Sequence, residues 1–191
     1  MGFYSSEELN AIGFKYVGKD VKISTKASIY NPQLISVGDY SRIDDFCVLS
    51  AGKGGINVGR YVHIAVFCSL IGAGNITLND FVNLSSRVSV YSSNDDYSGN
   101  YLTNPTVPSK YTNVYHAPVL IDKHVIIGSG SVVLPGVILE EGVSIGALSL
   151  INKNCKRFTI YAGVPAKPVK ERSSNLLEYE TMFLGESEIN S

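Results

Sequence analysis

Valine, isoleucine or leucine recurs at every sixth position along most of the chain, a period that belongs to neither an α-helix nor a flat strand. A chain that winds in triangular coils, with three short strands per coil and one inward aliphatic residue per strand, produces this period. The positions form six triplets with a step of six inside each: Val17, Ile23, Ile29; Val37, Ile43, Leu49; Val58, Ile64, Leu70; Leu78, Leu84, Val90; Ile121, Ile127, Val133; Leu139, Ile145, Ile151. The pattern predicts an all-β fold, a parallel β-helix of about six triangular coils.

Extra residues between coils follow the third strand of a triplet, so a single corner of the triangle is lengthened. The steps after Ile29, Leu49, Leu70 and Val90 are eight, nine, eight and thirty-one residues. The largest insertion, residues 91–118, is rich in Asn, Asp, Ser, Pro and Tyr, which is typical of a loop. Long loops in compact repeats often carry binding or catalytic residues, so we expect this corner loop to hold function.

Both ends of the chain lie outside the aliphatic ladder. Ser5 and Ser6 followed by Glu7 and Glu8 predict the start of a short helix. After Ile151 we expect an extended strip that leaves the coil, then a short amphipathic helix. The expected division of the chain is residues 1–16 for the N-terminal helix and cap, 17–155 for the β-helix, and 156–191 for the closing strip, the C-terminal helix (173–185) and a tail.

Composition excludes several classes of protein. The 191 residues are 45% hydrophobic and 17% charged, which suits one folded domain. The net charge is 16 − 17 = −1 with no basic run, so neither nucleic acid nor an anionic membrane is an expected partner. No stretch has the length of a membrane span, and we expect a cytoplasmic protein. Metal-ligand spacing is absent. Cys47 and Cys68 lie two residues before ladder aliphatics and are expected to be buried small side chains.

Outward positions on the last coils are also apolar: Leu120, Ile126, Val132, Ile138, Leu150. A stacked set of apolar residues on a regular prism makes a flat surface that should be covered. We therefore expect a homo-oligomer, and a prism with three equal faces favours a homotrimer.

Three motifs near the C-terminus carry a family resemblance: Ile127-Gly-Ser-Gly-Ser-Val-Val-Leu-Pro-Gly-Val, Ile145-Gly-Ala-Leu-Ser and Tyr161-Ala-Gly-Val-Pro-Ala-Lys. Together with the ladder and the corner loop, they resemble the hexapeptide-repeat acyltransferases. The resemblance implies a left-handed parallel β-helix trimer, an exception to the right-handed crossover rule. It also implies acyl transfer from an acyl-CoA co-substrate, at active sites between neighbouring subunits, with no permanently bound cofactor.

The resemblance further implies the residues that contact coenzyme A. Relatives line the pantetheine channel at the positions that match Ser129, Gly146, Ala147, Asn152 and Lys153, and they place basic residues against the phosphates at the positions of Lys167 and Lys170. Lysines on a mobile strip suit a phosphate that must bind and leave. The alternative is that these lysines only solvate the surface.

An aspartate at the start of the corner loop bears on the chemistry. The O-acetyltransferase branch has a histidine base where this chain has Asp95, in the strand Val88-Ser-Val-Tyr-Ser-Ser-Asn94-Asp95. Acylating an alcohol needs a base with a pKa near the working pH, which an ordinary aspartate does not have. An amine is already a nucleophile as the free base, so Asp95 would orient it, with Asn94 and Asp96 beside it. The branch that N-acylates nucleotide-linked amino sugars has a similar Asn-Asp pair.

Other residues compete for the same roles. His63 is an outward residue in a polar column with Arg42 and Asn83 from adjacent coils, and His116 lies at the exit of the loop, so either histidine could be a base. His124 is expected to be exposed to solvent. Tyr91 and Tyr97 could stack on a sugar or a base, or could only pack the loop. Asn-Asp-Asp at a loop start is also ordinary turn chemistry.

The leading hypothesis is an acyl-CoA-dependent N-acyltransferase that acts on a nucleotide-linked amino sugar in polysaccharide or glycan biosynthesis. The amine would attack the thioester directly, without a covalent enzyme intermediate. The first alternative is a sugar O-acetyltransferase with a histidine base, and the second is a β-helix binding module without catalysis.

Overall fold

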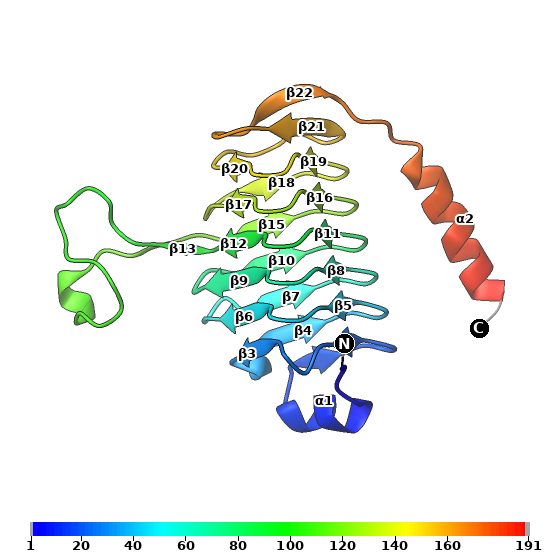
Figure 1. Ribbon diagram of the computed structural model, residues 1–191, viewed down its shortest axis with the longest axis horizontal. Helices are drawn as coiled ribbons and strands as arrows, with labels where there is room; N and C mark the ends of the chain where they lie inside the picture. The colour runs from blue at the N-terminus through cyan, green and yellow to red at the C-terminus, as the bar shows by residue number, and fades with distance from the viewer. Residues whose placement is uncertain (1, 190–191) are drawn as a thin grey trace.

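The computed structural model describes the backbone of residues 2–189 and the side chains of residues 2–186, and it confirms the predicted parallel β-helix (Figure 1). Three parallel sheets form the faces of a prism. The first holds β1 (Tyr16–Val17), β4 (Ile35–Val37), β7 (Ile56–Val58), β10 (Ile76–Leu78), β15 (Val119–Ile121) and β18 (Ile138–Leu139). The second holds β2 (Lys22–Ile23), β5 (Arg42–Ile43), β8 (His63–Ile64), β11 (Asn83–Leu84), β16 (Ile126–Ile127), β19 (Ser144–Ile145), β21 (Thr159–Ala162) and β22 (Lys167–Glu171). The third holds β3 (Ser28–Tyr30), β6 (Val48–Ala51), β9 (Ser69–Gly72), β12 (Ser89–Tyr91), β17 (Val132–Val133) and β20 (Leu150–Ile151).

The inward aliphatic residues form one continuous core. Parallel pairing places each of them over its counterpart in the next coil, as Ile43, Ile64 and Leu84 do in the second sheet. All ladder positions are buried except Val17 and Ile29, which lie in the first coil and have no coil beneath them. Burying one such side chain contributes about 1.5–3 kcal/mol, so the stacked ladder is the main source of stability.

The first coil is covered by α1 (Ser6–Ile12), as the sequence predicts. Ser5 Oγ accepts a hydrogen bond from the Glu8 backbone N–H, and the Glu8 carboxylate accepts one from the Ser5 N–H. This capping box satisfies two N–H groups that would otherwise be unpaired at the start of the helix. Leu9 is buried and joins the hydrophobic core, so α1 closes the lower end of the prism.

The corner loop leaves the prism after β12 and returns at β15, again as predicted (Figure 1). Its two ends pair as the antiparallel strands β13 (Ser93–Asn94) and β14 (Tyr115–His116), and a short 3₁₀ turn, η2 (Ser109–Tyr111), lies near its tip. A second 3₁₀ turn, η1 (Pro32–Leu34), lengthens the same corner between β3 and β4. Only the base of the loop is therefore held by the coils.

The expectation that the closing strip leaves the coil after Ile151 is wrong. Cys155 forms a bridge with Leu139, and Tyr161 pairs with Ile145, so a seventh partial coil continues the prism. The step from Cys155 to Tyr161 is again six residues, and both side chains are buried. The ladder thus continues with a thiol and a phenol, residue types that the Val/Ile/Leu pattern does not count. β22 then folds back antiparallel on β21.

The C-terminal helix α2 (Leu176–Ile189) begins three residues later than expected and continues through residues that were expected to form a tail. Residues 190 and 191 lie outside the described residues. Whether 1–16, 17–155 and 156–191 behave as separate units stays a prediction.

A column of stacked rings follows the corner between the first and second strands. Tyr40, Tyr61, Phe81 and His124 form this aromatic column, and successive ring centroids are 5.0 Å apart. Each of the four residues has a φ between 56° and 61°, because the same left-handed turn recurs in every coil. The prediction that His124 is exposed is wrong: its side chain is 9% exposed, since it stacks on Phe81 and contacts α2.

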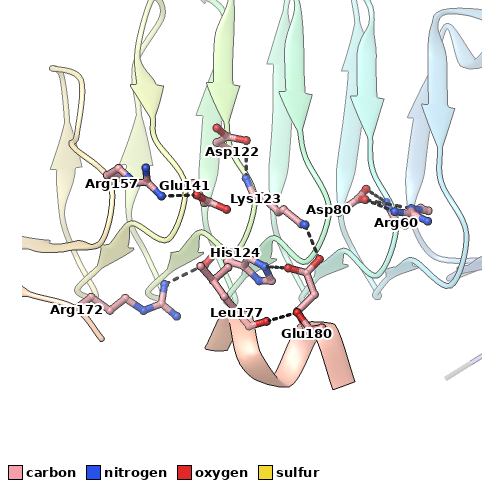
Figure 2. Close-up of polar contacts among 11 residues, drawn as sticks. Arg60, Asp80, Asp122, Lys123, His124, Glu141, Arg157, Arg172, Leu177 and Glu180 are labelled. Carbon is pink, nitrogen blue, oxygen red and sulfur yellow. Dashed lines mark hydrogen bonds and ion pairs between the residues drawn. The ribbon is translucent and has the colours of Figure 1, made fainter. Parts of the chain in front are cut away.

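α2 contacts the aromatic column through polar and apolar side chains, and Figure 2 shows the polar contacts at His124. The Glu180 carboxylate accepts hydrogen bonds from His124 Nε2, at 2.8 Å, and from Lys123 Nζ. The Phe183 ring packs edge-on against Tyr61, with centroids 5.1 Å apart. Just before the helix, Arg172 donates to the His124 carbonyl at 2.9 Å. These contacts fasten the C-terminal segment along the side of the coils.

Replacement of Glu180 by Ala should release α2 without unfolding the prism. Lys123 and His124 would lose their partner, which costs about 1–3 kcal/mol. We expect faster hydrogen exchange across 176–184 and unchanged exchange in β5, β8 and β11. Glu178→Ala is the matched control, because Glu178 is exposed on the same helix. Equal exchange in the two variants would contradict the role of Glu180.

The same contact should weaken in acid. Burial by itself opposes the ionisation of Glu180, but hydrogen bonds from Lys123 and His124 outweigh it, so the pKa of Glu180 is lowered. Since the docked state favours the ionised carboxylate, its stabilisation is complete above the ordinary pKa of about 4.3 and is lost as the pH falls below it. Exchange measured across that range should show α2 released before the coils.

Candidate functional site

Small residues bring the base of the corner loop against the coils. Gly72 has a φ of 144°, and a Cβ there would lie 2.3 Å from Ser92 Oγ. A Cβ on Gly74 would lie 2.6 Å from the Ala117 carbonyl oxygen. Neither position accepts a side chain without moving the loop, because real Cβ contacts are longer than this. The two glycines therefore fix where β13 and β14 leave the prism.

The β13–β14 pair places the predicted catalytic histidine opposite the Asn-Asp segment. Ser93 pairs with His116, and Asn94 pairs with Tyr115. Ser93 Oγ lies 2.8 Å from His116 Nδ1 and accepts a hydrogen bond from the Ala73 N–H at 2.7 Å. The His116 residue is exposed to solvent, so it can meet a ligand outside the coil.

The structure distinguishes the two aspartates that follow β13. Asp96 accepts hydrogen bonds from the Ser98 N–H and hydroxyl and from Asn113 Nδ2, and the pKa of its carboxyl is lowered by those bonds, Ser98 contributing most. Asp96 thus holds the loop together. Asp95 is exposed, which leaves its carboxylate available to a substrate.

The two tyrosines at this corner also differ. Tyr91 ends β12, is half-buried and pairs with Ile71, so it belongs to the coil. Tyr97 is 86% exposed, so within one chain it does not pack the loop. Its ring is free to contact a ligand or another subunit.

The polar column predicted on the second sheet is present, with a buried carboxylate beside it. Arg42, His63 and Asn83 occupy paired positions on β5, β8 and β11. Arg42 Nε donates to Asp44 at 2.6 Å, and His63 Nε2 lies 3.0 Å from the other oxygen of Asp44. The Asp44 side chain is only 7% exposed, so its buried carboxylate orients the side chains of Arg42 and His63.

Sequence reasoning missed Asp44, although a signal for it exists. Period-two geometry puts Arg42 and Asp44 on the same side of the strand, with inward Ile43 between them. Within one chain, His63 lies in the second sheet, whereas Asp95 lies beyond the third, at the corner loop. A contact between His63 and Asp95 would therefore join two subunits, with Asp95 of one chain reaching His63 of another, and this stays a prediction.

Three of the predicted coenzyme A residues line one pocket at the C-terminal end of the prism. Asn152, Lys153 and Lys167 surround a pocket of about 400 Å³, together with Tyr161 and Ala166. The pocket lies where the last full coil meets the hairpin of β21 and β22. Sequence positions fifteen residues apart are thus brought together by the fold-back.

The other predicted coenzyme A residues lie outside this pocket. Ser129 and Ala147 are exposed at stacked corners of consecutive coils, where the Ser129 carbonyl accepts a hydrogen bond from Leu148 N. Gly146 donates its N–H to the Tyr161 carbonyl. Lys170 pairs with Ile160 in the hairpin and is exposed. The predicted coenzyme A residues thus lie in one pocket and at one stacked corner, and Lys170 lies on β22 outside both.

The three thiols are not available as nucleophiles. Cys47 and Cys68 are completely buried, and burial raises the pKa of the Cys155 thiol to about 11. A thiol buried inside the core cannot be reached by a thioester. In the part of the chain that the structure describes, no group of His, Cys, Asp and Glu side chains is arranged to hold a metal ion. Neither described helix is long and apolar enough to span a membrane.

The chain is similar in sequence to acyltransferases that act on sugars. No family model matches the chain. It is 57% identical over 183 residues to a dTDP-4-amino-4,6-dideoxy-D-glucose acyltransferase from Escherichia coli, covering 96% of this chain and 95% of the relative. It is 23% identical over 150 residues to the galactoside O-acetyltransferase of Escherichia coli K12, covering 78% of this chain and 70% of the relative.

Solved structures of AntD, an N-acyltransferase from Bacillus cereus, have the same fold. A serine variant of AntD in complex with dTDP-4-amino-4,6-dideoxyglucose and coenzyme A is 47% identical to this chain, with a TM-score of 0.94 over 97% of this chain and 98% of that chain. AntD in complex with dTDP and 3-hydroxybutyryl-CoA is 48% identical, with a TM-score of 0.91 over 99% of this chain and 98% of that chain. The chain belongs to the family of hexapeptide-repeat acyltransferases, in the branch that N-acylates dTDP-linked amino sugars.

Proposed function

We propose that this protein transfers an acyl group from an acyl-CoA to the 4-amine of dTDP-4-amino-4,6-dideoxyglucose, in the biosynthesis of a polysaccharide or glycan. The relative from Escherichia coli acts on that sugar nucleotide, and AntD binds it together with coenzyme A. The observation in this chain that carries the proposal is the exposed carboxylate of Asp95 at the base of the corner loop.

Asp95 suits an amine better than a hydroxyl. A sugar ammonium is attracted to a carboxylate, and its free base attacks a carbonyl without further activation. A hydroxyl must lose its proton in the transition state, and an ordinary aspartate is too weak a base to take it. Asp95 therefore holds and orients the amine, with Asn94 beside it on β13.

The chemical step is a direct transfer. The amine lone pair forms the C–N bond at the thioester carbonyl carbon, and the C–S bond breaks with its electron pair on sulfur. The proton that the nitrogen loses is taken up by this sulfur, so the products are an amide and the free thiol of coenzyme A. Backbone N–H groups of the coil stabilise the negative oxygen that forms in between. The burial of all three thiols agrees with a mechanism that lacks an acyl-enzyme intermediate.

Coenzyme A binds along the C-terminal coils, with Asn152, Lys153 and Lys167 in the terminal pocket and Lys170 above it. Ser129, Gly146 and Ala147 contact the pantetheine arm at the stacked corners. The protein acts as a cytoplasmic homotrimer, with active sites between subunits. Support comes from the outward apolar residues of the last coils, of which Ile138 is 39% exposed in one chain.

A second candidate is O-acetylation of a sugar hydroxyl with His63 as the base. One observation favours it: buried Asp44 holds the His63 imidazole, as a third group orients a general base in many enzymes. In the leading proposal, the same cluster of Arg42, His63 and Asn83 contacts the sugar nucleotide instead.

A paired-substrate assay tests the proposal. Purified protein is incubated with acetyl-CoA or 3-hydroxybutyryl-CoA and either dTDP-4-amino-4,6-dideoxyglucose or its matched analogue with a 4-hydroxyl group. We expect an amide from the amino sugar and no ester from the hydroxyl sugar, by mass spectrometry. An ester from the hydroxyl sugar, with no amide from the amino sugar, would establish the O-acetyltransferase alternative and refute the leading proposal.

Replacement of Asp95 by Asn should lower kcat/KM for the amino sugar about 10²-fold. The amine would lose a hydrogen bond to a charged carboxylate, which contributes about 2–3 kcal/mol to binding the transition state. KM for acyl-CoA should stay within about twofold. Asp95 is exposed, so the melting temperature should not change, and Glu178→Gln is the control for loss of a surface carboxylate. Native kcat/KM in Asp95→Asn would remove Asp95 from the mechanism.

Replacement of Lys167 by Ala should raise KM for acyl-CoA about tenfold, since one phosphate contact is lost. With an acyl-pantetheine, which has no nucleotide phosphates, Lys167→Ala and the native protein should react equally. Lys53→Ala, an exposed lysine at a different corner, is the control. If Lys167→Ala impaired acyl-pantetheine as strongly as acyl-CoA, the lysine would not be a phosphate contact.

A further inference from the structure

Ser93 is the hydrogen-bond partner of the His116 imidazole. The hydroxyl of Ser93 accepts a hydrogen bond from the Ala73 N–H at 2.7 Å and lies 2.8 Å from His116 Nδ1. A hydroxyl has one hydrogen to donate, and among the described residues Nδ1 is the acceptor within its reach. A hydrogen bond donated by this hydroxyl to Nδ1 leaves the hydrogen of the neutral imidazole on Nε2.

Nε2 of His116 points away from the partner that fixes the ring. The residue is exposed, and no contact of Nε2 with another described residue is present. In this tautomer Nε2 has no lone pair with which to take a proton from a substrate. His116 therefore presents a hydrogen-bond donor to whatever lies outside the base of the loop, and this differs from the base considered for it from the sequence.

Asp95 directly follows β13, and the alternation of that strand, continued by one residue, puts Asp95 on the same side of the ribbon as His116. Ser93 and His116 are directly opposite each other, so their side chains share one face. Asp95 is two residues beyond Ser93 and returns to that face by the period of two. Diagonal neighbours in such a pair are about 7–8 Å apart. Side chains that start at that separation can both reach one small group, Asp95 by a hydrogen bond to the amine and His116 by one to the carbonyl oxygen.

We propose that the Nε2–H of His116 donates a hydrogen bond to the thioester carbonyl oxygen, while Asp95 holds the attacking amine, and that Ser93 is the positioning residue for His116. The inference rests on the proposed function. As the C–N bond forms, the carbonyl π electrons move to oxygen, where Nε2–H stabilises the charge. They return when the C–S bond breaks, so His116 neither gains nor loses a proton.

Three variants of His116 test the donor role. In His116→Gln the side-chain amide nitrogen lies where Nε2 was and remains a donor, whereas His116→Asn is too short and His116→Ala has no donor. We expect kcat within about tenfold of native for Gln and a loss of about 10²–10³-fold for Asn and Ala, with KM for acyl-CoA unchanged. The acid limb of the pH–rate profile should have the same midpoint in native protein and His116→Gln.

Two results would overturn the donor role. His116→Gln as inactive as His116→Ala, with the acid limb abolished, would make His116 a base. Native kcat in all three variants would remove His116 from the reaction.

Variants of Ser93 test the positioning role. Ser93→Ala removes the donor to Nδ1, so the imidazole divides its proton between the two nitrogens and kcat should fall severalfold. Ser93→Thr keeps a hydroxyl and should restore kcat. Melting temperatures of both variants separate this effect from the loss of the Ala73 contact. A fall in kcat that Thr does not restore would contradict the positioning role.

Nitrogen-15 NMR of the histidine ring identifies the tautomer without requiring catalytic activity. In native protein at a pH where free imidazole is neutral, Nε2 should be protonated and Nδ1 should carry no hydrogen, with His116→Ala assigning the signals. Ser93→Ala should shift both nitrogen signals towards an average. Protonated Nδ1 in native protein overturns the inference even if the amino sugar is acylated. The predicted tautomer in a protein that acylates no amine would instead confirm the role of Ser93 and refute the proposed substrate.

Discussion

Stacking of inward aliphatic side chains, coil upon coil and in register, is the constraint on which the rest of the structure depends. Parallel pairing puts Ile43 beneath Ile64 and Ile64 beneath Leu84, so each buried side chain is covered on two sides. A residue inserted inside a strand would turn every following side chain to the opposite face. Insertions are therefore confined to corners, and in this chain they gather at the corner after the third strand.

The same register produces the other columns of the molecule. Because equivalent positions lie one above another, a left-handed turn residue that is aromatic in one coil meets a ring in the next, and α2 docks on the resulting column (Figure 2). On the second sheet the repeat stacks Arg42, His63 and Asn83 around buried Asp44. The rigid prism thus displays polar groups at fixed spacing, while the loop base brings Asp95 and His116 to one corner.

Most of the fold follows from the sequence because its signal is periodic and local. The period of six predicts the coils, and the departures from six predict the corner loop. The last partial coil could not be predicted from aliphatic residues, since Cys155 and Tyr161 fill its inward positions. The burial of His124 could not be predicted either, because it depends on Phe81 and Glu180, which are more than forty residues away in sequence on either side.

The candidate site is predicted less completely than the fold. Asp95 and His116 are recognisable from their place at the ends of the insertion. The residues around them are not recognisable from the sequence. Ser93 accepts a hydrogen bond from Ala73 of the preceding coil, and Asp44 holds the side chains of Arg42 and His63. Asn152, Lys153 and Lys167 meet in one pocket only because β22 folds back on β21, whereas Lys170 follows that strand outside the pocket.

The central claim is that the base of the corner loop presents Asp95 to the amine of a dTDP-linked sugar. The most direct measurement is a crystal structure of the assembled protein with coenzyme A and dTDP-4-amino-4,6-dideoxyglucose. We expect the Asp95 carboxylate within hydrogen-bond range of the amine, about 3 Å, and the thiol of coenzyme A on the other side of that nitrogen. A separation of more than about 10 Å between Asp95 and the amine would contradict it, because no orienting group acts over that distance.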